Sequence, residues 1–180
     1  MNLSFYRLND LLFEGDGAYL RVLLSSFRCS SNPDAESFLK NTAITHEKNG
    51  ISRTYVLLEG DDFGNDPFIK GFFTLAVKCL TVNKQHSIPD KIYAQMNVNR
   101  GIAQAYLLGQ LAKTDGAEKG FGKEMIERAL DIFARGNKMF GCRVVRLDCK
   151  DQLIDYYESC GFTYADKSHN GALNQMITII

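Results

Sequence analysis

Two kinds of hydrophobic spacing alternate along the chain and predict where it is helical and where it is extended. Residues 30–50 (SSNPDAESFLKNTAITHEKNG) have a helical pattern near the start of the chain. Ser31 or Asn32 is expected to cap this helix, Pro33 occupies its first turn, and Gly50 is expected to end it. The N-terminal part of the chain is therefore predicted to be rich in helix.

A stronger helical pattern covers residues 122–136 (GKEMIERALDIFARG). Its apolar residues recur every three or four positions and predict one buried face. They are Met125, Ile126, Ala129, Leu130 and Phe133. Oppositely charged residues lie four positions apart on the other face, which is expected to be exposed. These pairs are Glu124 with Arg128 and Asp131 with Arg135.

Strand-like segments occupy the middle and the end of the chain. Residues 53–60 (RTYVLLEG) and 68–80 (FIKGFFTLAVKCL) are predicted to form a hairpin around a turn at 61–67. The further segments are strands over 104–113, 143–148, 161–166 and 173–180 and a short helix over 151–159. This order predicts a mixed α/β (α+β) fold. Residues 1–180 contain no repeat, low-complexity tract or linker, so we expect a single domain.

Composition narrows the functional classes. The chain has 180 residues, 45% of them apolar, and its 21 basic and 21 acidic residues give no net charge, which counts against a general polyanion binder. No apolar run approaches the roughly 18 residues of a membrane span, and the start has no small-residue cleavage site, so we expect a cytoplasmic protein. Five cysteines without a C-x-x-C pair predict reduced, mostly buried thiols and no metal site.

Charge is unevenly distributed along the neutral chain. Residues 54–69 carry only acidic groups, at Glu59, Asp61, Asp62 and Asp66, whereas residues 117–150 carry eight basic against five acidic residues. One interpretation is a solvated acidic loop beside ordinary helix charges. The other is a basic site for a phosphorylated ligand, with an acidic rim where a cationic substrate arrives.

Two glycines stand between a predicted strand and the long helix, in the segment KGFGK (119–123). Unpaired backbone N–H groups at a helix start can converge on a phosphate, and glycine lets the main chain come close to it. Lys119 and Lys123 either add charge there or are simply solvated. The pair is also compatible with an ordinary loop entry into the helix.

Two familiar phosphate motifs do not fit this segment. A P-loop has four residues between its glycines and then Lys-Ser/Thr, but Gly116 and Gly122 enclose five, and Glu124 follows Lys123. In the dinucleotide fingerprint G-x-G-x-x-G, Met125 replaces the third glycine. ATP hydrolysis is therefore disfavoured, and nicotinamide binding is a minor alternative.

The run LLGQLAKTDGAEKGFGKEMIERAL (107–130) resembles the acetyl-CoA-binding segment of the GNAT superfamily of N-acetyltransferases, whose signature is Q/R-x-x-G-x-G/A. The resemblance implies acetyl-CoA as co-substrate. It assigns the main chain of Leu111, Ala112 and Lys113 to the pantetheine arm, and that of Glu118, Lys119, Gly120, Phe121, Gly122 and Lys123 to the pyrophosphate. The sequence departs from the signature at Ala117, where the family has Gln or Arg.

Two further segments carry the resemblance. LIDYYESCGF (153–162) looks like the family's A-x-x-F-Y-E-x-x-G-F ending, and residues 27–60 with 69–76 are similar to the acetyltransferase toxins of bacterial toxin-antitoxin pairs. The likeness covers roughly residues 27–164. It implies one domain with a central mixed, mostly antiparallel sheet flanked by helices, and it leaves an antitoxin or a second copy open as partner.

The resemblance also implies the chemistry, which is acetyl transfer to a primary amine. It places Tyr157 where the family's tyrosine general acid stands, and a phenol with a pKa of about 10 suits protonation of a thiolate. Packing is the alternative explanation, because Leu153 and Ile154 share a helical face with Tyr157. Tyr156 is the second candidate for the acid. Backbone N–H groups near Leu111–Lys113 would stabilise the oxyanion.

Other candidate residues are less well defined. His46, His86 and His169 lie in polar stretches and are expected to be solvated, so no general base is assigned. Cys149 and Cys160 have no histidine near them in sequence that would activate a thiol. Arg53 matches the toxin-like branch and is a candidate for the acceptor groove.

The acceptor is left open between a small amine, a protein amino group and the amino group of aminoacyl-tRNA. The neutral charge disfavours tRNA, since phosphate contacts require lysine and arginine. The alternative from another class is a non-catalytic acyl-CoA-binding or regulatory module of the same fold. Both the enzyme and the non-catalytic module would keep the glycines that bind the cofactor, so a measurement of turnover is needed to distinguish them.

Overall fold

The structure is a computed structural model that describes residues 1–180 except 1, 15–16, 61–66, 83–86 and 169–170. The chain divides into two compact units: Met1–Leu75 with Gln110–Met125, and Ala76–Gly109 with Ile126–Ile180. One strand and one helix, β6 and α6, contribute residues to both. The single domain over 1–180 therefore stays a prediction.

The described elements, in chain order, are β1 (Asn2–Arg7), α1 (Leu8–Glu14), α2 (Gly17–Ser26), α3 (Pro33–Asn41), α4 (Ala43–Lys48), β2 (Arg53–Gly60), β3 (Phe68–Val77), β4 (Leu80–Thr81), α5 (Asp90–Tyr93), β5 (Ile102–Ala103), β6 (Ala105–Lys113), α6 (Phe121–Phe140), β7 (Val144–Cys149), the 3-10 helix η1 (Asp151–Leu153), α7 (Ile154–Ser159), β8 (Thr163–Lys167) and β9 (Asn174–Ile179). The predicted α/β class is confirmed.

The first unit contains the predicted hairpin. Strand β2 pairs antiparallel with both β1 and β3, and the end of β6 lies next to β3. There the backbone N–H of Gln110 donates to Thr74 Oγ1 at 2.7 Å, and that of Thr114 donates to the Lys70 carbonyl at 2.8 Å. Most of the predicted hairpin turn, residues 61–66, lies outside the described residues.

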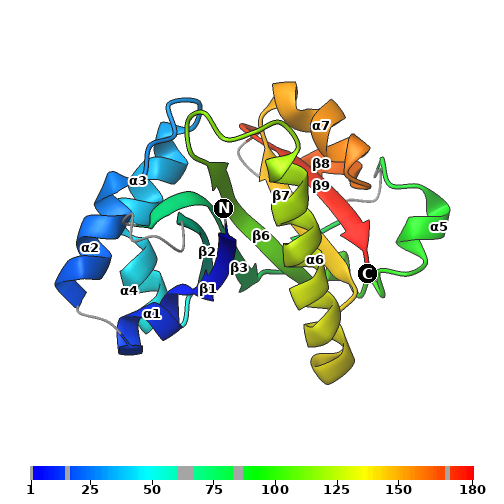
Figure 1. The fold of residues 1–180 in the computed structure, drawn as a ribbon. Helices are drawn as coiled ribbons and strands as arrows, with labels where there is room; N and C mark the ends of the chain where they lie inside the picture. The colour runs from blue at the N-terminus through cyan, green and yellow to red at the C-terminus, as the bar shows by residue number, and fades with distance from the viewer. Residues whose placement is uncertain (1, 15–16, 61–66, 83–86, 169–170) are drawn as a thin grey trace. The chain divides into compact units, whose positions relative to one another are not determined.

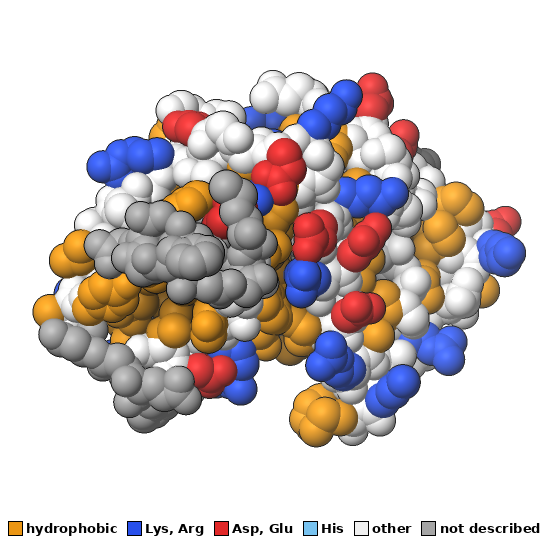
Figure 2. Space-filling view, viewed as in Figure 1, with side chains coloured by type: hydrophobic (Ala, Val, Ile, Leu, Met, Phe, Trp, Pro, Cys, Tyr) orange, Lys and Arg blue, Asp and Glu red, His pale blue; other side chains and the backbone are white. Residues whose placement is uncertain are grey.

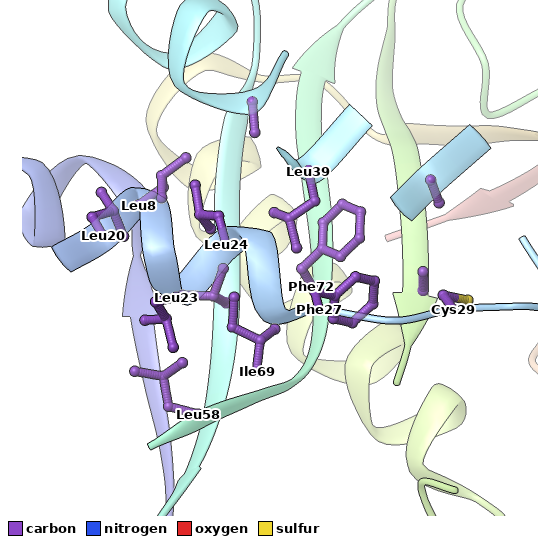
Figure 3. Packing of buried hydrophobic residues seen from close by; sticks show 14 residues of the cluster. Leu8, Leu20, Leu23, Leu24, Phe27, Cys29, Leu39, Leu58, Ile69 and Phe72 are labelled. Atoms are coloured by element: carbon purple, nitrogen blue, oxygen red, sulfur yellow. The ribbon is translucent and has the colours of Figure 1, made fainter. Parts of the chain in front are cut away.

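Helices α1 to α4 gather against β1, β2 and β3 (Figure 1). Their apolar faces form the core of this unit with one face of the strands. Figure 3 shows Leu23 of α2 beside Leu58, and Phe27, which follows α2, beside Phe72 of β3. Burial of these side chains stabilises the unit by about 0.8 kcal/mol for each CH₂ group removed from water.

The helix predicted over residues 30–50 is divided in two. Thr42 leaves the helical conformation, with φ −120° and ψ −34°, and separates α3 from α4. The predicted ends are confirmed: the Asn32 side chain accepts from the Ala35 N–H at 3.2 Å, and Gly50 has φ +67°. Strand β1 precedes these helices and was not predicted.

A β-bulge interrupts the pairing of β2 with β3. Leu57 pairs with Gly71 and Leu58 pairs with Ile69, so Lys70 is an extra residue on β3. In a regular strand, Ile69 and Gly71 would share a face. Here Ile69 joins the core under the helices, whereas Lys70 and Gly71 both face the start of α6. The bulge keeps Ile69 in the core and redirects the lysine.

In the second unit, β6 pairs parallel with β7, and β9 pairs antiparallel with β7 and β8. The strand order is thus β1-β2-β3-β6 in the first unit and β6-β7-β9-β8 in the second. The β6–β7 ladder covers Ala105–Leu107 and then ends, although both strands continue. The predicted mixed, mostly antiparallel sheet is confirmed.

Helix α6 buries four residues of the predicted apolar face, Met125, Ile126, Ala129 and Phe133, whereas the fifth, Leu130, is half-buried. It runs past the predicted stop at Gly136 to Phe140. That glycine serves close packing instead, because a Cβ there would lie 2.9 Å from Tyr106 Oη. Figure 2 shows acidic and basic side chains interspersed over the outer face of this helix.

Candidate functional site

The loop between β6 and α6 has a backbone that glycine makes possible. Gly116 and Gly120 have φ values of +80° and +95°, and an added Cβ would have no neighbour within 4 Å at either position. Within the described part of the chain, the backbone N–H groups of Lys119, Gly120 and Gly122 donate no hydrogen bond. These groups at a helix start are available to an anion.

The side chain of Lys113 fixes the middle of this loop. Its Nζ donates to the carbonyls of Ala117 at 2.8 Å and Glu118 at 3.0 Å. The lysine that ends β6 therefore turns two carbonyl oxygens toward itself. This arrangement leaves the N–H groups of the loop directed elsewhere.

The start of the loop is tied to the segment after α2. The Arg28 carbonyl accepts from the Asp115 N–H at 2.9 Å and from Thr114 Oγ1 at 3.1 Å. The Asp115 carboxylate in turn accepts from the N–H and the hydroxyl of Ser30, at 2.9 and 2.7 Å. These contacts join residues 85 or more positions apart in the chain, so no local sequence pattern predicts them.

A buried cation lies beneath the loop. Lys70 Nζ is 3.0 Å from Glu59 Oε1, 2.8 Å from Glu118 Oε1 and 5.2 Å from the centre of the Phe121 ring. The Lys70 side chain is 9% exposed, Glu59 is 16% exposed and Glu118 is 59% exposed. The hydrogen bond to Glu118 raises the pKa of Lys70 despite its burial, and the same bond lowers the pKa of Glu118.

Sequence reasoning missed Lys70, although a signal for it exists. It is the one charged residue of the apolar strand β3, and Gly71 follows it directly. A charge is rarely buried without a partner, so a lysine in such a strand indicates a specific ion pair.

The start of α6 packs closely on β3. A Cβ on Gly71 would lie 2.7 Å from Met125 Sδ, 2.8 Å from Phe121 Cε1 and 3.1 Å from the Ala112 carbonyl oxygen. Phe121 is 2% exposed. Because position 71 has no side chain, the N-terminus of the helix packs directly against the strand.

The residues predicted to contact the acyl-CoA lie together in the first unit. Leu111, Ala112 and Lys113 end β6, and Glu118, Lys119 and Gly120 are exposed in the loop that follows. Phe121 is buried, so only its main chain is available to a ligand. Gly122 and Lys123 lie in the first turn of α6, with the Lys123 side chain exposed.

Tyr157 lies in the second unit and is the one buried residue of α7. Its ring contacts those of Phe162, at 6.0 Å, and Tyr156, at 5.2 Å, between centroids. Burial raises its pKa well above the ordinary value of 10. Burial also raises the pKa of the half-buried Tyr156, to about 12. Leu153 belongs to η1, which precedes α7, and its side chain is 38% exposed, so it does not complete the predicted apolar face with Ile154 and Tyr157.

The remaining candidates of the sequence analysis are the histidines, Arg53 and the acidic residues 61, 62 and 66. His46 is half-buried, contrary to expectation, because its ring packs edge-on against Phe38 at 5.3 Å. Arg53 Nη1 donates to the carbonyl and the carboxylate of Glu47, at 2.9 and 3.1 Å. His86 and His169, like Asp61, Asp62 and Asp66, lie outside the described residues.

All five cysteines are free, and Cys29 and Cys149 are buried, Cys142 and Cys160 half-buried and Cys79 exposed. The described residues contain no cluster of three or more His, Cys, Asp or Glu side chains suited to a metal ion.

Among the helices described, none has the length and apolarity to cross a membrane. A hollow of about 770 Å³ in the second unit is lined mainly by polar residues and contains none of the predicted site residues.

Comparison with solved structures identifies the fold. The AtaT structure in complex with acetyl-methionyl-tRNAfMet is 20% identical, with a TM-score of 0.75 over 96% of this chain and 94% of that one. A tyrosine-to-phenylalanine mutant of KacT is 18% identical, with a TM-score of 0.74 over 99% and 95%. A tyrosine-to-phenylalanine mutant of the AtaT toxin, bound to the C-terminus of the antitoxin AtaR and acetyl-CoA, is 16% identical, with a TM-score of 0.71 over 99% and 94%.

No protein-family model matches the sequence, and no curated protein is similar enough to match it. Identities of 16–20% between these chains establish a shared architecture, not a shared activity. The chain therefore has the GNAT fold, which it shares with AtaT and KacT.

Proposed function

We propose that this protein is an acetyl-CoA-dependent N-acetyltransferase that acts on a primary amine. The observation that carries the proposal is the loop from Glu118 to Lys123. Its three unpaired N–H groups stand at the start of α6, and Gly120 leaves open space where a Cβ would be. The structure of AtaT with acetyl-CoA supports the choice of ligand.

The loop suits a pyrophosphate for physical reasons. Backbone N–H groups and the positive end of the helix dipole favour an anion, and the glycine lets its oxygens come close to the main chain. We assign the pantetheine arm to the main chain of Leu111, Ala112 and Lys113. The β6–β7 ladder ends at Leu107, before these residues, which supports this assignment.

Acetyl-CoA supplies a thioester, and the chain has to supply position and protons. The nitrogen of a neutral amine forms a bond to the carbonyl carbon, the C–S bond breaks, and the thiolate requires a proton. We assign that proton to the Tyr157 hydroxyl. The proton lost by the amine passes to water, and the tyrosinate left after the transfer regains a proton from solvent, which restores the balance. A phenol with the ordinary pKa of about 10 is already protonated at neutral pH, and burial, which raises the pKa of Tyr157, makes it a weaker acid. Tyrosine-to-phenylalanine mutants of two similar proteins direct attention to such a residue.

The acceptor is proposed only as a primary amine. AtaT in complex with acetyl-methionyl-tRNAfMet favours the amino group of an aminoacyl-tRNA, and the AtaR complex favours an antitoxin partner. The zero net charge of this chain argues for a small amine or a protein amino group instead. Acetylation of aminoacyl-tRNA should fall steeply with added salt, whereas a small amine should respond little.

The first experiment is calorimetric titration of the purified protein with acetyl-CoA, beside a variant with Gly120 and Gly122 both changed to alanine. Gly50→Ala is the matched control, because Gly50 also has a positive φ and open space around it but ends α4. Saturable binding lost only in the double variant supports the proposal. Absence of binding by the folded wild-type protein would refute it.

Turnover separates the enzyme from a non-catalytic acyl-CoA-binding module of the same fold. The enzyme should release CoA when amines or aminoacyl-tRNA are added, at a rate that depends on Tyr157. A protein that binds acetyl-CoA but releases none with any acceptor would favour the module.

A further inference from the structure

Glu118 occupies an unusual position for a residue of an anion-binding loop. Its carboxylate lies 2.8 Å from the buried Lys70 Nζ, and this contact lowers the pKa of the carboxylate. The side chain of a loop residue therefore engages the cation beneath the loop. A carboxylate bound in this way resembles a phosphate oxygen held by the same cation.

Two carboxylates share the cation Lys70. Glu59 and Glu118 both pair with it, and Lys113, whose Nζ lies 3.0 Å from the Glu118 carbonyl, adds a second positive charge next to Glu118. A pyrophosphate next to the Glu118 carboxylate would be repelled by it, since like charges at close range interact unfavourably even near a protein surface. Binding is thus opposed as long as Glu118 keeps its place.

The two carboxylates differ in their freedom to move. Glu59 belongs to β2 and its side chain is 16% exposed, whereas Glu118 belongs to the loop and its side chain is 59% exposed. Glu118 is therefore the carboxylate that turns into solvent with the smaller loss of contacts. Lys70 is directed to this place by the bulge in β3 and stays there with Glu59 as its partner.

We propose that Lys70 is a pyrophosphate-binding residue and that Glu118 is an internal competitor, which holds the site in the free protein and leaves it when the acyl-CoA binds. This inference rests on the proposed function, because it assumes that the loop takes a pyrophosphate. It adds a side-chain cation to a site otherwise made of backbone groups.

Glu118→Gln tests the competition directly, because the amide is isosteric and uncharged. Acetyl-CoA is expected to bind this variant about threefold to tenfold more tightly at low ionic strength, the range of a partly exposed ion pair with an added repulsion. Glu127→Gln is the matched control. Glu127 is an exposed glutamate of α6, and its loss changes the net charge of the protein equally.

Lys70→Met completes a double-mutant cycle with Glu118→Gln. Loss of the lysine should weaken acetyl-CoA binding about tenfold or more, and Glu118→Gln should no longer tighten it. A gain of equal size without the lysine would overturn the inference, since the carboxylate would then act by repulsion alone. Thermal unfolding checks the Lys70 variant, and the Glu118 comparison stands even if that variant does not fold.

The outcomes separate the two proposals. Wild-type binding with no difference between Glu118→Gln and Glu127→Gln refutes the competitor and leaves the acetyltransferase intact. Failure of wild type and both glutamine variants to bind acetyl-CoA refutes both. Tighter binding confined to Glu118→Gln and dependent on Lys70 supports the inference.

Discussion

Gly71 offers the sharpest test of how the loop and helix α6 are positioned. An added Cβ would lie 2.7 Å from Met125 Sδ, 2.8 Å from Phe121 Cε1 and 3.1 Å from the Ala112 carbonyl oxygen. The sulfur ends a flexible side chain and can move. The Phe121 ring is 2% exposed and the carbonyl belongs to the main chain, so neither yields easily.

The cost of Gly71→Ala follows from two opposing contributions. Overpacking a close-packed site costs about 1–3 kcal/mol. Replacing glycine by alanine restricts the unfolded chain and returns about 0.4–1 kcal/mol. The net expectation is a loss of about 1–2 kcal/mol in the free energy of unfolding. For a chain of this length that loss lowers the Tm by about 3–6 °C.

Urea unfolding and thermal melting measure this loss, with Gly60→Ala as the control. A Cβ on Gly60 would lie 3.6 Å from Pro67, an ordinary contact, so that variant should be neutral or slightly more stable than wild type. Gly71→Ala should also weaken acetyl-CoA binding, because the displaced Phe121 begins the helix at the loop. Equal stability of the two variants would refute the packing argument.

Three further predictions concern other parts of the molecule. Tyr157→Phe should slow acetyl transfer about a hundredfold with the acetyl-CoA Kd nearly unchanged, and unchanged turnover in steady-state assays would exclude the acid role. Contacts with the Cys29 N–H, at 2.7 Å, and with Lys40 lower the pKa of Glu36 below 4.5. The difference in the free energy of unfolding between wild type and Glu36→Gln should therefore be full near pH 6 and shrink as the pH falls below 4.5. Urea titrations measure this difference, and a value that does not change with pH would contradict the prediction. The buried Tyr106 hydroxyl has no hydrogen-bond partner in the described part of the chain, so Tyr106→Phe should not lower the Tm. A clear fall in Tm would mean that the hydroxyl forms a hydrogen bond that stabilises the fold.

Local patterns predicted most of the elements. The strands at 53–60 and 104–113 and the apolar face of α6 follow from residue spacing, since burial on one face imposes a period. The continuation past Gly136 depends on close packing with Tyr106, which local propensity does not contain, and the local pattern did not predict the break at Thr42.

The candidate site was predicted only in its local part. The glycine loop could be predicted because its residues are adjacent in sequence. Its attachment to Arg28 and Ser30 and the pairing of Lys70 with Glu118 join distant segments, and each partner by itself is an ordinary polar residue. Whether Tyr157 takes part stays a prediction.

The bulge in β3 has a consequence for how this chain should be aligned with its relatives. Ile69 and Gly71 pair with neighbouring residues of β2, so removal of Lys70 would restore a regular ladder with both neighbours in place. Relatives without the lysine are therefore expected to lack the residue altogether, not to replace it. If the gap is placed elsewhere, Ile69 is aligned with a residue on the opposite face of the sheet. The presence or absence of a lysine at position 70 is then assigned wrongly.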